Sequence, residues 1–336
     1  MVNVQKIASV ARLIHQSGSN VAVRLAEKEG ISRQAASTRL AQMRGAGLIS
    51  SVGRGRGTKY ALLDTARVKK DYKKEGLSED DVWRELCAPV INDLPENVRG
   101  IWHHGMTEMI NNAIDHSGSE SVQVGMFRNA LFTRGYVSDS GEGIFLKIQR
   151  ALNLYDPRES ILELAKGKFT TDPANHSGEG IFFSSKMFDH FSIQSGALCF
   201  LHGSDEPDVL FERPKNKEGT LVVMQLDNDS SHTSKEVFDR FALPEEFSFA
   251  KTIVPVKLAQ YEGEKLVSRS QAKRLTRRFE RFHIVILDFS GVEEIGQGFA
   301  DEVFRVFKNA HPEIEMTPIQ TSDAVLAMIK RVQNAF

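Results

Sequence analysis

The chain has little cysteine and no long apolar run. Its 336 residues include only two cysteines, Cys87 and Cys199, which are too few for a disulfide framework and fit a reducing compartment. No stretch approaches the roughly 20 apolar residues that a membrane-spanning helix needs, and the first residues lack the apolar core of a signal peptide. The sequence therefore predicts a cytoplasmic protein that has no membrane segment.

The chain also lacks a large net charge, but its charges are unevenly distributed. The formal net charge is -1, yet residues 1–75 contain 15 lysines and arginines against 5 acidic residues, and the remainder contains 28 against 39. A basic part joined to an acidic body predicts a polyanionic partner for the first part. A solvated basic surface without a partner is the alternative.

The basic N-terminal part has the pattern of a helix-turn-helix. Apolar periodicity predicts three helices, over residues 4–16, 21–28 and 33–44. Asn20 and Ser32 are the expected N-caps of the second and third helices. Two short apolar segments then flank a tip rich in glycine and arginine, which predicts a hairpin. The arrangement resembles the winged helix-turn-helix of bacterial transcription regulators, and we assign residues 1–66 to a DNA-binding domain.

The third predicted helix suits the major groove of DNA, and the hairpin tip suits phosphates or a minor groove. The side chains that we expect to contact DNA are polar or basic and lie on these two elements: Arg33, Gln34, Thr38, Arg39, Arg54, Arg56 and Lys59. A winged helix used only for protein contacts is the alternative. Residues 67–89 are expected to be a linker or a helix, with Ser78 as the cap of a helix that begins at Glu79.

Three segments of the next part have the chemistry of an ATP site when they are taken together. The first places Glu108, Asn112 and His116 four residues apart, so that a helix aligns them on one face. In the second, Asp139 ends a predicted strand and is followed by Gly141 and Gly143. The third runs from Ser177 to Ile181 and contains Gly178 and Gly180 before an apolar helix. The segments are separated by about 20 to 35 residues, and this order makes the combined pattern specific.

Each segment has a chemical reason to contact part of ATP. A carboxylate at a strand end, Asp139, can accept a hydrogen bond from the exocyclic amine of adenine. Glycines before a helix leave backbone N–H groups open to phosphates. Lys166 or Lys168 is expected to neutralise a terminal phosphate, with a merely solvated lysine as the alternative. Residues 147–176 are expected to form a mobile lid, and Thr220 to close the far side of the pocket.

The combined pattern resembles the ATP-binding domain of the GHKL superfamily, the Bergerat fold, which gyrase-type ATPases, heat-shock-90 chaperones, histidine kinases and mismatch-repair ATPases share. The spacing of Glu108, Asn112 and His116 is most similar to that of the anti-sigma-factor serine kinases. The resemblance covers about residues 90–228, and we assign the domain to 90–248. It implies an α/β sandwich whose mostly antiparallel sheet has helices on one face. No P-loop motif occurs.

The resemblance also implies a role for each candidate residue. Glu108 would be the general base, Asn112 would hold Mg²⁺ between the phosphates, and His116 would complete the binding face. Asp139 would recognise adenine, with Thr220 supporting that side. Four glycines would shape the pocket and bind phosphate: Gly141, Gly143, Gly178 and Gly180. The expected cofactors are therefore ATP and Mg²⁺, with slow hydrolysis.

From about residue 250 the pattern changes to alternating strands and helices, which predicts a small α/β domain over residues 249–336. The segments 287–292 and 298–302 resemble the STAS fold, and in particular a STAS-like domain of unknown function found beside such ATPases. In anti-sigma-factor antagonists a serine in the turn before this helix accepts phosphate. Here the turn, residues 295–298, has no hydroxyl, which favours an interaction role over phosphorylation. A purely structural cap is the alternative.

The expected fold is thus a multidomain α+β chain, and three functions remain open. The first is an ATP-dependent regulator that binds DNA, with a conformation that depends on the nucleotide. The second is a protein serine/threonine kinase of the anti-sigma type, and the third is a stress or phage-defence ATPase. The expected partners are ATP and DNA, with a protein partner through the C-terminal domain and a homodimer left open, and no membrane.

Overall fold

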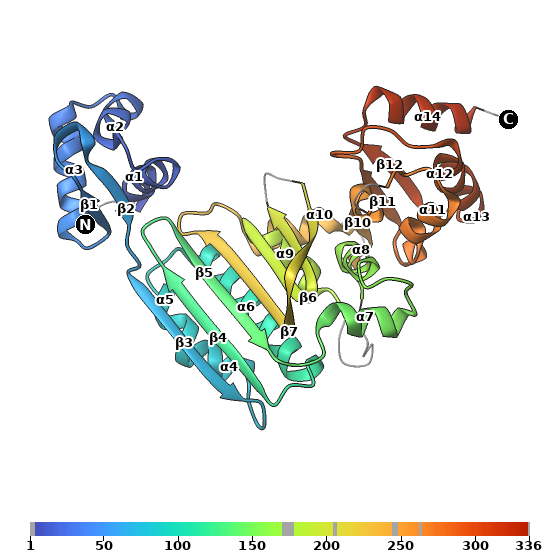
Figure 1. Ribbon diagram of the computed structural model, residues 1–336, viewed down its shortest axis with the longest axis horizontal. Helices are drawn as coiled ribbons and strands as arrows, with labels where there is room; N and C mark the ends of the chain where they lie inside the picture. The colour runs from blue at the N-terminus through green and yellow to red at the C-terminus, as the bar shows by residue number, and fades with distance from the viewer. Residues whose placement is uncertain (1–3, 170–177, 204–206, 244–247, 262–263, 335–336) are drawn as a thin grey trace. The chain divides into compact units, whose positions relative to one another are not determined.

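The computed structural model describes residues 4–169, 178–203, 207–243, 248–261 and 264–334. It is a mixed α/β, multidomain protein that divides into two compact units (Figure 1). The first unit contains residues 1–116, 120–138 and 223–233, and the second contains residues 117–119, 139–222 and 234–336. Within the described part of the chain, no helix combines the length and the apolar character that a membrane span requires.

The N-terminal part of the first unit consists of three helices and a hairpin. The helices are α1 (Val4–Gln16), α2 (Val21–Glu29) and α3 (Arg33–Gly45), and the hairpin pairs β1 (Ile49–Val52) with β2 (Lys59–Leu62). The Ser32 hydroxyl accepts a hydrogen bond from the Ala35 N–H at 3.1 Å, so this expected cap is confirmed. The Asn20 side chain makes no cap bond, because Asn20 is itself left-handed and uses its carbonyl instead.

These elements share one apolar core. It is built from buried residues of α1, α2, α3 and β1: Val10, Leu13, Ile14, Val21, Leu25, Ala26, Ala36, Leu40, Met43 and Ile49. The periodic apolar positions of all three helices point into this core, which is the physical reason why the helical periodicity of the sequence was informative.

A five-stranded sheet follows, in the order β3-β4-β5-β7-β6. Its strands are β3 (Ala66–Lys73), β4 (Ser121–Arg128), β5 (Phe132–Asp139), β6 (His190–Gly203) and β7 (Val209–Asp227). Strand β3 lies at one edge and pairs antiparallel with β4, with Ala66 opposite Arg128 and Lys73 opposite Ser121.

The structure has a strand where we expected a linker or a helix over residues 67–89. Strand β3 is rich in lysine and mostly exposed, because an edge strand buries few of its side chains and charged residues are common there. Its composition therefore conceals it from a pattern search. Only after β3 do the helical segments begin, with α4 (Glu79–Val82), a π-helical turn (Trp83–Cys87) and α5 (Ala88–Ile91).

Helix α6 (Glu96–His116) packs directly on the sheet. Its buried stripe includes Trp102, Met106 and Met109. At Gly135 of β5, a Cβ would lie 2.7 Å from the Trp102 ring and 3.0 Å from the Met106 sulfur. The helix can approach the strand this closely only because residue 135 has no side chain.

The second unit contains four short helices after β5. They are α7 (Ile144–Leu152), α8 (Glu159–Lys166), α9 (Gly180–Met187) and α10 (Ser234–Phe241). Four phenylalanines, Phe182, Phe183, Phe241 and Phe249, form an aromatic cluster between these helices and the short strand β9 (Ser248–Phe249), which pairs with β8 (Ala242–Leu243). Of the expected lid, residues 147–169 are therefore largely helical, and residues 170–176 lie outside the described residues.

The C-terminal part is a small parallel α/β layer, as the alternating pattern predicted. Strands β10 (Lys251–Pro255), β11 (Ile284–Asp288) and β12 (Glu315–Ile319) pair in that order. Helix α11 (Arg269–Thr276) lies between β10 and β11 in the chain, α12 (Gln297–Asp301) and α13 (Lys308–Ala310) lie between β11 and β12, and α14 (Asp323–Gln333) follows β12. We expected α11 to continue to about Phe282, but it ends at Thr276, and Arg278 then adopts a left-handed conformation with φ of 65°.

Candidate functional site

The first candidate segment lies on α6 in the first unit. Glu108, Asn112 and His116 are half-buried, whereas Met109 and Ile110 are buried, so the helical spacing of the polar row is confirmed. The Asn112 Nδ2 group donates to the Glu108 carbonyl oxygen at 2.8 Å. This bond uses the amide nitrogen, whereas a Mg²⁺ ion would need the amide oxygen.

The second unit brings together Asp139 and Thr220, which are 81 residues apart in the chain. Asp139 ends β5 and is buried. Its Oδ1 atom accepts hydrogen bonds from the Gly141 N–H at 2.9 Å and from the Thr220 N–H at 3.2 Å. The Thr220 hydroxyl in turn accepts the N–H of Ile144, the first residue of α7, at 3.0 Å. The carboxylate orientation is therefore fixed by the backbone of two elements.

The glycines around Asp139 allow very close backbone contacts. A Cβ on Gly141 would lie 1.7 Å from the Ser117 carbonyl oxygen, and one on Gly219 would lie 2.1 Å from the Asp139 carbonyl oxygen. Gly143 has φ of 89°, and its Cβ would lie 2.3 Å from the Ser195 hydroxyl. We expected Gly141 and Gly143 to let the backbone approach a ligand. The close approach in the structure is between protein segments, and a ligand contact stays a prediction.

The third segment is described from Gly178 onward, and Ser177 lies outside the described residues. Gly178 has φ of 74°, and its carbonyl oxygen accepts the Phe169 N–H at 3.1 Å. Gly180 begins the apolar helix α9, as expected. Burial raises the pKa of the Glu179 carboxyl between the two glycines, and the positive charge of Lys168 opposes this shift.

The two lysines that we expected near a terminal phosphate are bonded within the protein. Lys166 is fully buried and donates to Glu163 Oε1 at 2.8 Å and to the Arg277 carbonyl oxygen at 2.8 Å. Lys168 donates to the Arg281 carbonyl oxygen at 3.0 Å and lies over the Phe282 ring. Lys166 is therefore a structural residue in this conformation. A phosphate contact by Lys168 would require its release from Arg281.

The candidate DNA-binding residues divide into two groups. Arg33, Gln34 and Thr38 are exposed on α3, and Arg54 and Lys59 are exposed at the hairpin. By contrast, Arg39 forms an ion pair with Glu29 and is half-buried, which ties α3 to α2. Its first role is thus structural. The side chain of Arg56 lies outside the described residues.

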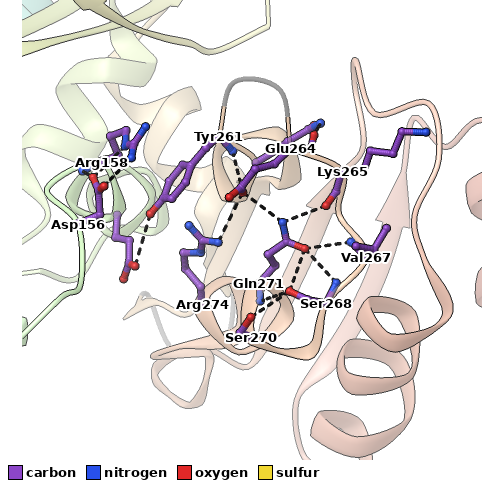
Figure 2. Close-up of polar contacts among 12 residues, drawn as sticks. Asp156, Arg158, Tyr261, Glu264, Lys265, Val267, Ser268, Ser270, Gln271 and Arg274 are labelled. Carbon is purple, nitrogen blue, oxygen red and sulfur yellow. Dashed lines mark hydrogen bonds and ion pairs between the residues drawn. The ribbon is translucent and has the colours of Figure 1, made fainter.

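Sequence reasoning missed the residues that hold α8 to the C-terminal part. Arg277 donates to Glu159 Oε2 at 3.1 Å, and Arg278 donates to Glu163 Oε2 at 3.0 Å. Tyr261 lies under the guanidinium groups of Arg158 and Arg274, at 4.1 and 4.2 Å from its ring centroid, beside the polar contacts around Gln271 (Figure 2). A run of basic residues in a predicted helix gave no signal that two of its arginines are anchors.

The C-terminal turn, residues 295–298, contains no serine, threonine or tyrosine, and an interaction role for it stays a prediction. Ser290, two residues after the end of β11, donates from Oγ to Asp288 Oδ1 at 2.7 Å, and its N–H donates to the same atom at 2.9 Å. At Gly296 a Cβ would lie 2.8 Å from the Val267 backbone, which explains the glycine. Among the described residues, no cluster of three or more His, Cys, Asp or Glu side chains has the arrangement of a metal site.

The parallel layer corresponds to a known family. Residues 271–326 match the model of a STAS-like domain of unknown function (DUF4325), which includes β11, β12 and the helices between them. The chain ends in a STAS-like domain. No curated protein and no solved structure matches the chain. The anchors Arg277 and Arg278 belong to this STAS-like domain, and Glu159 and Glu163 belong to helix α8 outside it.

Proposed function

We propose that this protein is an ATP-binding regulator whose nucleotide state controls its binding to DNA. The observation that carries the proposal is the junction of Asp139, Gly141 and Thr220. A buried carboxylate at a strand end, oriented by two backbone N–H groups, suits the recognition of one particular amine. Adenine presents such an amine. The resemblance of the three motifs to the GHKL superfamily supports the same assignment.

Phosphate and Mg²⁺ binding would use backbone groups and one amide. The N-terminus of α9, which begins at Gly180 and follows Gly178, offers N–H groups of the kind that bind phosphate. Asn112 has an amide oxygen of the kind that Mg²⁺ accepts, and Glu108 on the same helix face is the proposed general base. With a single protein ligand, the metal would depend on the phosphates for most of its coordination.

The DNA side of the proposal depends on α3 and the hairpin as a winged helix. The exposed side chains Arg33, Gln34 and Thr38 occupy the first turns of α3, which is where a recognition helix contacts base edges. Exposed Arg54 and Lys59 at the hairpin suit phosphate contacts. Because Arg39 is paired with Glu29, we now assign it to the support of this helix rather than to base contact.

One strand offers a route between the two activities. Strand β7 carries Thr220, which caps α7, and ends at Asp227. Arg12 of α1 donates to Asp227 at 3.1 Å and to Asp229 at 2.5 Å. A shift of β7 on nucleotide binding would therefore change the ion pairs that Arg12 of α1 forms with Asp227 and Asp229. This supports the coupling, which requires that the nucleotide bind two conformations with different affinity.

The test is a pair of binding measurements on the full chain. Calorimetry should detect Mg-ATP binding, and Asp139→Asn should weaken it about tenfold or more, because the amide replaces one acceptor oxygen with a donor. Asp71→Asn, on strand β3, is the control. DNA affinity at fixed salt should then differ between Mg-ATP, ADP and no nucleotide. Equal DNA affinity in all three conditions would refute the coupling, and absence of Mg-ATP binding would refute the nucleotide assignment.

A second candidate function is a protein serine/threonine kinase of the anti-sigma type. The STAS-like domain in the same chain favours it, because STAS proteins are the substrates of such kinases in the resemblance described above. Incubation with ATP labelled at the γ-phosphate would distinguish the two functions. Label that appears on a protein partner supports a kinase, whereas release of inorganic phosphate alone supports a regulator with slow hydrolysis.

A further inference from the structure

Arg278 of the STAS-like domain forms hydrogen bonds with helix α8 and with the residues that directly follow it. Its Nη1 group donates to Glu163 Oε2 at 3.0 Å, and its Nη2 group donates to the carbonyl oxygens of Gly167, at 3.2 Å, and Lys168. The guanidinium carbon also lies 5.4 Å from the centroid of the Phe169 ring. We call these four contacts the Arg278 clamp. Only 7% of Arg278 is exposed, so solvent does not screen the clamp.

The backbone on both sides of the clamp is left-handed. Lys168 has φ of 52° and Arg278 has φ of 65°, and neither is glycine. At Gly167, with φ of 83°, a Cβ would lie 2.6 Å from the Phe249 ring. Such conformations persist only where the surroundings impose them, and they are concentrated at functional and switching sites. Here the clamp holds the carbonyl oxygens of Gly167 and Lys168, and Arg281 donates a further hydrogen bond to the Lys168 carbonyl oxygen at 2.9 Å.

The clamp leads directly to the third candidate segment. Phe169, which lies against Arg278, donates its N–H to the Gly178 carbonyl oxygen at 3.1 Å. A Cβ on Gly178 would lie 2.4 Å from the backbone of Phe169. Gly178 therefore lies against the clamped segment without space between them, and Phe169 contacts both Arg278 and Gly178.

The neighbouring ion pair between the STAS-like domain and α8, Arg277 with Glu159, does not include the residues next to Gly178. Arg277 is adjacent to Arg278 in sequence and pairs with Glu159, one helical turn before Glu163 on α8. Its guanidinium group joins α8 to the STAS-like domain through Glu159, and in the described part of the chain it forms no hydrogen bond to residues 167–169. Both arginines thus form an ion pair with a glutamate of α8. Only Arg278 also donates to the carbonyl oxygens of Gly167 and Lys168.

We propose that Arg278 is a positioning residue for the phosphates of the nucleotide: the STAS-like domain, through the Arg278 clamp, sets the conformation of Gly178 and of the start of α9, and thereby the affinity for ATP. This inference rests on the proposed ATP binding. Arg278 bonds to protein carbonyls and a carboxylate, and it acts on the nucleotide only through the Phe169–Gly178 contact. The STAS-like domain is therefore a regulatory part of the ATP site within the same chain.

The experiment compares Arg278→Gln with Arg277→Gln in the full chain, and uses Mg-ATP and adenosine as ligands in calorimetry. Arg278→Gln should weaken Mg-ATP binding about tenfold, a typical size for coupling between sites, and should leave adenosine binding unchanged, since adenosine has no phosphate. Arg277→Gln should leave both unchanged. An equal loss for both ligands in Arg278→Gln, or equal effects of the two substitutions, would overturn the proposal.

Thermal unfolding of a third variant and hydrogen exchange separate a loss of positioning from a loss of folding. Arg278→Lys retains the charge beside Glu163 but lacks the planar fork that reaches two carbonyls, so it should be more stable to heat than Arg278→Gln and still lose Mg-ATP affinity. Hydrogen exchange without nucleotide should be faster at residues 178–183 in Arg278→Gln than in Arg277→Gln. If the wild type binds no Mg-ATP, the proposed function fails by itself. Unchanged exchange would show that the clamp does not control Gly178.

Discussion

Gly219→Ala should destabilise the protein far more than the equivalent change at Gly196. Both glycines are left-handed, with φ of 70° and 58°, so each alanine should cost about 1–2 kcal/mol for that conformation. At Gly196 nothing lies within 4 Å of the new Cβ, and this is the whole cost. At Gly219 the Cβ would lie 2.1 Å from the Asp139 carbonyl oxygen and 2.7 Å from Asp139 Oδ1.

The clash at Gly219 is with backbone, so β7 has to move away from Asp139. Overpacking of this kind adds about 1–3 kcal/mol, and the total loss should be about 2–5 kcal/mol, against about 1–2 kcal/mol for Gly196→Ala. The movement also breaks the bond from the Thr220 N–H to Asp139. Gly219→Ala should therefore lose Mg-ATP affinity as well, whereas Gly196→Ala should keep it.

Urea unfolding of the two variants, followed by circular dichroism, measures the difference. The free energies should be compared from the change in midpoint at a common slope. Equal losses in the two variants would show that β7 and Asp139 are not in the close contact described here. A loss of stability in Gly219→Ala without a loss of ATP affinity would instead detach Asp139 from nucleotide recognition.

Three other predictions concern single side chains. Burial lowers the pKa of Lys166 from 10.5 to about 8. The unfolded chain binds more protons between these values, so the free energy of unfolding should rise from pH 8 to 10. Urea unfolding of Lys166→Met should lack this rise, and parallel curves for the two proteins would contradict it. Ser32→Ala should cost about 1 kcal/mol through loss of the cap, measured by thermal unfolding. Arg33→Ala should weaken DNA binding and reduce its salt dependence, whereas Arg39→Ala should mainly lower stability through loss of the Glu29 contact, and titrations at several salt concentrations would separate the two.

The sequence was most informative where one face of an element is buried. The stripe of Met109 and Ile110 on α6 predicted the helix and its polar face, since burial imposes the helical period on the apolar residues. The alternating pattern after residue 250 predicted the parallel layer for the same reason. Asp139 could be selected from the sequence because a strand end followed by glycines is a strong local signal. Thr220 was selected as well, and in the structure its N–H donates to Asp139 Oδ1.

The elements that were missed are those whose form depends on distant partners. Strand β3 is polar because it lies at the sheet edge, and its pairing with β4, about 50 residues later, leaves no local pattern. From the sequence, Lys166 cannot be distinguished from a surface lysine. In the structure it is buried and donates to Glu163 and to the Arg277 carbonyl oxygen. The end of α11 at Thr276 has no proline or glycine to mark it, although Arg277 leaves the helical conformation and Arg278 is left-handed with φ of 65°.

The connection between the hairpin and the sheet is short enough to act as a stiff joint. Strand β2 ends at Leu62 and β3 begins at Ala66, so three residues, which span at most about 10 Å, join them. Leu63 donates to the Leu48 carbonyl oxygen, and Thr65 donates to that of Arg128, which leaves Asp64 between two fixed ends. If the protein binds DNA as a dimer, this connection would limit how far each group of three helices and a hairpin could move from the start of β3 to reach its half-site.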